Sequence, residues 1–219
     1  MLRRRALPLA SAVLATALRL LPLHAAEQPF GLDGLDVLWF QDDAARGVSI
    51  ISQDFDAPDD ALDSQGADDF SIPKGQVWRI QEIHVYGKHT PGDGRLSSMN
   101  LVIYKDSEDR PSRPGAVVAS VSGLRVSGSE GDYYIKLGDG IRLTKGKYWL
   151  SLQGNPESGK WSWMTTRRKH FGRGAVWRNP PDGYQTGCTD YQPQFRCFGD
   201  IDQGEDFAFN MFGRRQLTN

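Results

Sequence analysis

The chain of 219 residues carries 26 basic and 27 acidic side chains, so it lacks the excess of positive charge with which proteins bind a nucleic-acid backbone. The one basic cluster, at residues 167–170 with Arg173, is interpreted as a solvated loop between strands. We therefore expect no nucleic-acid partner.

Residues 1–26 have the layout of a secretory signal peptide. A basic start is followed by an apolar run at 6–23, and Ala25 and Ala26 are the small residues expected at a cleavage site. Arg19 interrupts the run, which is therefore too short for a membrane span of about 20 clean apolar residues. We expect a secreted or periplasmic protein with no membrane span in the mature chain.

Short runs rich in β-branched and aromatic residues follow one another along the mature chain, separated by turn residues, and no stretch sustains capped helical periodicity. This pattern predicts an all-β fold: a two-sheet antiparallel sandwich of jelly-roll type with about ten short strands. We expect residues 27–219 to form this single domain, with 27–50 as an N-terminal lead-in. The expected strands are 37–41, 47–52, 68–72, 77–87, 99–105, 116–122, 132–137, 147–153, 160–166, 175–178 and 206–212.

Alternation along two of these strands indicates which faces are buried. In 147–153, one parity is apolar and the other is mostly polar, as in a strand with one face on the core. In 77–87, the apolar residues change parity between Ile80 and Ile83. This change predicts a β-bulge near Gln81 and Glu82.

Cys188 and Cys197 are the only cysteines, and the segment between them is polar. A cysteine pair in an exported chain usually forms a disulfide. A structural zinc site needs four ligands, and the histidines of the mature chain lack finger spacing. We expect a disulfide that pins one surface loop.

No complete catalytic motif is present in the sequence. Residues 154–161 come close to a phosphate-binding loop, but Trp161 stands where a magnesium-binding Ser or Thr is required. The sequence contains neither a G-x-S-x-G elbow nor an H-E-x-x-H motif. We therefore predict no catalytic residues and no cofactor. Paired carboxylates stay open as an alternative, because their separation in space cannot be derived from sequence.

Seven aspartates lie between residues 52 and 70, and none of them begins an EF-hand loop. Asp is common in turns, so this segment is predicted to be mainly a turn-rich entry to the sandwich. The alternative is structural calcium, which carboxylates bind where strands begin. Its expected ligands come from this segment and from a second acidic group before the last strand: Asp68, Asp69, Asp200 and Asp202.

Aromatic residues offer a candidate ligand surface. Trp161 and Trp163 are two positions apart, so on a strand they share a face at a spacing of about 6.7 Å. This arrangement fits a sugar-stacking platform, but it also fits a core face. Trp177, Tyr184 and Tyr191 flank the expected disulfide loop, which is the first candidate for a ligand surface.

A resemblance is carried by residues 67–73, 78–87, 101–106 with 113–120, 146–153, 174–191 and 206–213. Together these segments resemble a group of secreted bacterial β-sandwich domains of unassigned function. The resemblance extends over most of residues 50–213, and it implies the same fold and export but assigns no activity and no catalytic residues. Its most specific part is a W-x-N-P…G-x-x-T-G-C segment, here Trp177, Asn179, Pro180, Gly183, Thr186, Gly187 and Cys188.

These observations predict a secreted, non-catalytic β-sandwich module that binds glycan or cell-envelope material. A secreted hydrolase with paired carboxylates is one alternative, and a purely structural or adhesive extracellular protein is another. Exposed Trp and Tyr on a flat surface would favour binding. A cluster of carboxylates in a deep cleft would favour the enzyme.

The signal peptide is tested by its processing. We expect cleavage beside Ala25 or Ala26, because the apolar run ends there in small residues. N-terminal sequencing of the exported protein measures the position. An exported chain that still begins at Met1 would contradict this expectation.

Overall fold

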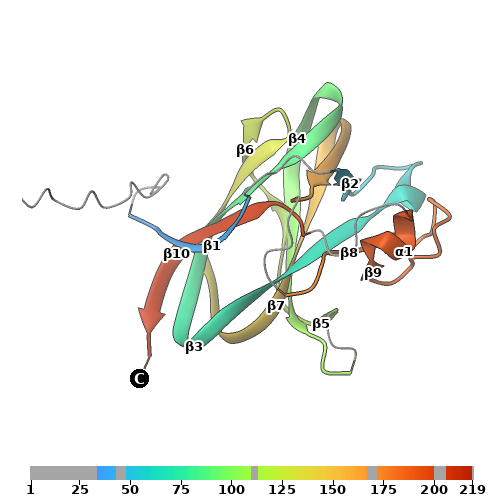
Figure 1. Cartoon of the computed structure of the whole chain (residues 1–219). Coiled ribbons are helices and arrows are strands. Elements are labelled where there is room, and N and C mark those ends of the chain that lie inside the picture. The colour runs from blue at the N-terminus through green and yellow to red at the C-terminus, as the bar shows by residue number, and fades with distance from the viewer. Residues whose placement is uncertain (1–33, 43–47, 110–112, 167–171, 200–205, 219) are drawn as a thin grey trace, which may run out of the picture. The chain divides into compact units, whose positions relative to one another are not determined.

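The computed structural model describes residues 34–42, 48–109, 113–166, 172–199 and 206–218 (Figure 1). The expected signal peptide, the first part of the lead-in and the basic residues 167–170 lie outside the described residues. Within these described ranges, no helix has the length and apolar character needed to cross a membrane.

The regular secondary structure of the described residues is almost entirely strand, which confirms the all-β prediction (Figure 1). They include a single turn of 3-10 helix at Asp60–Leu62 and one short α-helix, α1 (Gln194–Phe198). The strands are β1 (Asp36–Gln41), β2 (Ser49–Ile51), β3 (Gln65–Val85), β4 (Gly87–Asp106), β5 (Pro114–Leu124), β6 (Val126–Ser129), β7 (Asp132–Met164), β8 (Val176–Arg178), β9 (Gln192–Pro193) and β10 (Phe209–Leu217).

The strands pair antiparallel in the order β1-β10-β3-β7-β4-β5, while β2 and β6 add to β7, β8 adds to β3 and β9 adds to β8. One buried apolar cluster nevertheless contains residues from β1 and from β4, which lie far apart in this order. The sheet must therefore curve around a shared core, as the predicted sandwich requires.

The strands are longer than the sequence pattern predicts. The expected strand 68–72 and most of 77–87 belong to β3, and most of three further expected strands, 132–137, 147–153 and 160–166, belongs to β7. The turn residues between them lie opposite each other, since Ile72 pairs with Gly146 and Val77 with Thr144 across a register shift. These residues therefore form an irregularity within two continuing strands instead of ending them.

The predicted β-bulge is confirmed. The register of β3 shifts between Ile80 and Glu82, against β7 and against β10. Because the bulge changes the parity, Trp78 and Ile80 before it and Ile83 after it are all buried in one core.

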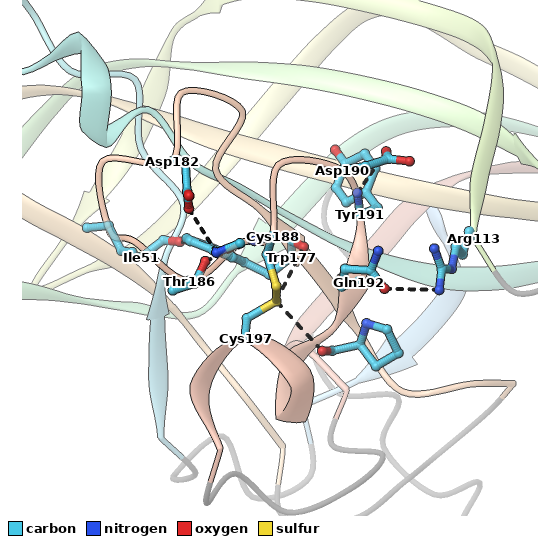
Figure 2. Close-up of a disulfide and its surroundings, with 12 residues drawn as sticks. Ile51, Arg113, Trp177, Asp182, Thr186, Cys188, Asp190, Tyr191, Gln192 and Cys197 are labelled. Carbon is cyan, nitrogen blue, oxygen red and sulfur yellow. Dashed lines mark hydrogen bonds between the residues drawn. A yellow bond between two sulfur atoms is a disulfide. The ribbon is translucent and has the colours of Figure 1, made fainter.

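The predicted disulfide is present between Cys188 and Cys197, whose Cα atoms are 5.9 Å apart (Figure 2). Cys197 lies in α1, which is only five residues long and therefore too short to produce a periodic signal in the sequence. Phe198 of this helix packs against Trp177 with ring centroids 4.7 Å apart. The bridge thus fastens the loop to the core.

Removal of the bridge tests its contribution to stability. The double variant Cys188→Ala and Cys197→Ala should lose about 2–3 kcal/mol of unfolding free energy, because the unfolded chain regains the entropy of a short closed loop. Urea denaturation of both proteins under oxidising conditions measures the difference. Equal midpoints would show that the loop is held by packing alone.

Candidate functional site

Most of the aromatic residues proposed from the sequence as a ligand surface are buried inside the protein. Trp161, Trp163 and Trp177 are fully buried, and Tyr191 is 3% exposed. For Trp161 and Trp163 the core interpretation is the one observed. For Trp177 and Tyr191 the expectation of a ligand surface is wrong, because the disulfide loop is packed down on the core.

Hydrogen bonds explain how these indole rings are buried. The Nε1 atom of Trp161 donates to the Gly131 carbonyl at 2.9 Å, and that of Trp163 donates to the Ala208 carbonyl at 2.9 Å. Trp177 donates in the same way to Ile51 at 2.7 Å (Figure 2). A buried tryptophan needs such an acceptor, so these side chains support the fold.

The two tyrosines of the disulfide loop also serve packing. Tyr191 lies under Arg178, whose guanidinium carbon is 4.4 Å from the ring centroid, and its hydroxyl contacts Ser151 at 3.2 Å. Tyr184 is half-buried against the edge of Trp177 at a centroid distance of 5.9 Å. Tyr191 therefore presents no open face for stacking.

Asp68 belongs to a buried hydrogen-bond network that joins β1 to β3. Its Oδ2 atom accepts from Gln41 Nε2 at 2.7 Å and from the Phe207 backbone N–H at 2.6 Å, and its Oδ1 atom accepts from the Asp69 N–H at 2.8 Å. Burial raises the pKa of the Asp68 carboxyl well above its usual range, and the charges of Asp206 and Asp69 raise it further.

The calcium alternative stays a prediction. Asp68 and Asp69 are buried, and the charge of Asp206, which belongs to the same acidic segment before the last strand as Asp200 and Asp202, acts on Asp68. Asp200 and Asp202 lie outside the described residues. In the described part of the chain, no group of three or more Asp, Glu, His or Cys residues is placed to hold a metal ion.

The other aspartates of this segment take part in turns. The Asp59 N–H donates to the Asp56 carbonyl at 3.0 Å, and Asp60 begins the single 3-10 turn. Asp63 accepts from the Phe55 N–H at 2.7 Å, and Asp54 accepts from Asn100 Nδ2 at 3.0 Å. Residues 54–63 therefore form a turn-rich entry to β3.

A different set of aromatic residues lies on the outer face of the sheet. Residues paired across antiparallel strands share a face, and the register places Phe40 beside Asn210, Asn210 beside His84, His84 beside Tyr134 and Tyr134 beside Ser127. Phe40 is 45% exposed and Tyr134 is 36% exposed. This row crosses β1, β10, β3, β7 and β6 and is called the outer row below.

His84 is stacked at the centre of the outer row. The centroid of its ring lies 4.0 Å from the ring centroid of Tyr134, at an interplanar angle of 11°, and 4.2 Å from the ring centroid of Tyr86. Burial lowers the pKa of His84 to about 4, while the charge of Asp42 acts in the opposite direction. The imidazole is therefore neutral near pH 7 and completes a continuous aromatic surface.

Hydrogen bonds of neighbouring polar side chains hold these aromatic residues in place. The Tyr86 hydroxyl donates to Asp42, and Asn210 Nδ2 donates to the same carboxylate at 2.6 Å. Asn210 Oδ1 in turn accepts from the Gln41 backbone N–H at 2.9 Å. Because these contacts join β1, β10 and β3, the rings are held in place before any ligand arrives.

A groove opens beside Tyr134 on the same face. Its origin is the bulge in β3: residues 137–140 of β7 lie opposite the single residue Gln81, so the two strands separate locally. The Oε1 atom of Gln81 is buried and accepts no hydrogen bond within the described ranges. The groove is lined by Leu35, Gln81, Glu82, Ser127, Tyr134, Lys136 and Gly138.

Neither the groove nor the outer row was expected from the sequence. A signal was nevertheless present, because Tyr134 and Lys136 have the parity opposite to the buried Tyr133 and Ile135. An outward tyrosine one strand away from an outward histidine predicts a polar aromatic face only when the register is known. The register comes from the fold.

Comparison with known proteins finds no matching family model, no matching curated protein and no matching solved structure. The resemblance of the segment around Trp177 to secreted bacterial domains therefore stays a prediction. The fold class and the disulfide rest on the structure itself.

The buried network around Asp68 is tested through Gln41, which is fully buried and also accepts from Trp39 Nε1 at 3.0 Å. Gln41→Ala should lower the unfolding free energy by about 2–4 kcal/mol, because buried donors and acceptors lose their partners. Urea denaturation measures the loss. Gln216→Ala, at an exposed position of β10, is the control and should change stability by less than about 0.5 kcal/mol. Similar losses in both variants would contradict a stabilising role of the network.

Proposed function

We propose that this protein is a secreted, non-catalytic module that binds glycan through the outer row and the adjacent groove. The observation that carries the proposal is the stacked, pre-organised aromatic group formed by half-buried His84 and Tyr86 with exposed Tyr134. Sugar rings present apolar C–H faces that stack on aromatic rings, and their hydroxyl groups bond to polar side chains placed around them.

The dimensions of the outer row support an extended ligand. Phe40 and Tyr134 are the outermost aromatic residues of the row, three strand spacings or about 14 Å apart. Tyr134 borders a groove with amide, hydroxyl, carboxylate and ammonium groups. A chain of sugars lying along the row would meet both of these aromatic rings and polar groups beside them.

The composition of the groove favours binding over hydrolysis. Glycoside hydrolysis requires two carboxyl groups that flank one bond. Among the residues that line this groove, Glu82 alone carries a carboxyl group, and its cross-strand neighbour in β7 is Lys136. A paired-carboxylate hydrolase therefore gains no support at this site.

Export is part of the same proposal. The disulfide between Cys188 and Cys197 is of the kind that persists in oxidising compartments. The segment 1–26 has the layout of a signal peptide in its sequence. A periplasmic or extracellular location would bring the outer row into contact with envelope or environmental glycans.

A glycan array tests the proposal by comparing the wild-type protein with the variant Tyr134→Ala. We expect the wild-type protein to bind a subset of polysaccharides and Tyr134→Ala to bind them about tenfold more weakly, since a stacking contact of about 1.4 kcal/mol is lost. Val117→Ala, at a 59% exposed position of β5, is the matched control and should bind normally. An array without a positive signal, or equal binding by Tyr134→Ala, would refute glycan binding at this face.

A further inference from the structure

Three arginines form a row across the outer face, next to the groove. The register pairs Arg214 of β10 with Arg79 of β3, and Arg79 with Arg142 of β7. All three side chains are exposed and share the face of the outer row, because Trp78 and Leu143, at the neighbouring positions, face the core. They are called the arginine row below.

This arrangement is unfavourable for the isolated protein. Like charges directly opposite each other on neighbouring strands destabilise a sheet. Within the described residues no carboxylate forms an ion pair with any of the three guanidinium groups, and Arg79 instead donates to the Asp139 backbone carbonyl at 3.0 Å. The chain as a whole has no excess of positive charge, so the row is a local concentration.

The arginine row is continuous with the groove. Arg79 is bonded to the segment 137–140, whose Gly138 lines the groove. A Cβ atom on Gly140 would lie 2.9 Å from Cγ of Arg79 and 2.9 Å from Cγ of Gln81, so this segment packs between the row and the groove wall. A ligand in the groove therefore lies next to guanidinium groups.

We propose that the glycan bound at this face is an acidic polysaccharide, with carboxylate or sulfate groups held by the arginine row while a neighbouring sugar stacks on Tyr134. The inference rests on the proposed function and adds the charge of the ligand. Guanidinium groups bind carboxylate and sulfate oxygens with paired hydrogen bonds. Three of them span two strand spacings, about 10 Å, which suits anionic groups repeated along a polymer better than one isolated anion.

Other charges at the site do not cancel the row. Glu82 lines the groove, but Lys136 lies directly opposite it in the neighbouring strand. Asp139 lies beside Arg79 and offers its backbone carbonyl to that side chain. With Glu82 offset by Lys136, the three arginines face the single carboxylate of Asp139 at this end of the face, so two positive charges stay in excess.

Matched pairs of polymers test the charge of the ligand. Polygalacturonate is compared with its methyl-esterified form, and dextran sulfate with dextran, by affinity electrophoresis of the purified protein. We expect retardation by the acidic member of at least one pair and little by its neutral partner. Retardation should also weaken as salt is added, since exposed charges are screened.

Variants of the row identify the site. Each of Arg79→Gln, Arg142→Gln and Arg214→Gln should weaken binding of the acidic polymer about threefold, and the triple variant about thirtyfold, because exposed ion pairs are individually weak. Arg196→Gln, at an exposed position of α1, is the matched control and should bind normally. Thermal melting of all variants checks that the fold is retained.

The outcomes separate the two proposals. Equal binding of neutral and acidic polymers, weakened by Tyr134→Ala but not by the triple variant, overturns the acidic ligand and leaves glycan binding standing. Failure to bind any acidic or neutral polymer, on the array or in the gel, overturns both. An oligothymidylate bound as tightly as the best acidic polysaccharide overturns the inference in favour of a nucleic acid, whose bases also stack on aromatic rings.

Discussion

The antiparallel pairing of β3 with β7 is the interaction on which the rest of the sheet depends. The two strands are paired, with interruptions, from Gly66 opposite Leu152 to Val85 opposite Tyr133. β10 and β8 add to the free edge of β3, while β2, β4 and β6 add to β7 (Figure 1). Since buried backbone groups must find partners, a central ribbon of this length decides where every other strand lies.

The irregularities of this ribbon produce both the core and the candidate site. At Gln81 the bulge changes the parity of β3, so that the second half of the strand can bury Ile83 and place half-buried His84 on the outer face. Opposite it, the extra residues 137–140 of β7 open the groove beside Tyr134. A regular ribbon would place its side chains in strict alternation and would leave no groove at this point.

The fold decides which aromatic side chains are buried and which stay available to a ligand. Tryptophan has the largest apolar surface, so the core takes Trp161, Trp163 and Trp177 together with acceptors for their N–H groups. The rings left outside are smaller and mixed with polar groups, as at His84 and Tyr134. A stable aromatic surface in solvent needs such support, and the bonds of Asp42 to its neighbours supply it.

The sequence by itself determined the all-β class, the bulge near Gln81 and the pairing of Cys188 with Cys197, because alternation, parity and a lone cysteine pair are local signals. It did not determine strand length, since the Gly-rich segments inside β7 have the composition of turns whether the chain reverses there or continues. The tertiary structure alone decided that Trp177 is buried and that Tyr134, His84 and the arginine row share one face. Register joins residues far apart in the chain, and the register follows from how the long strands pack, which no single segment encodes.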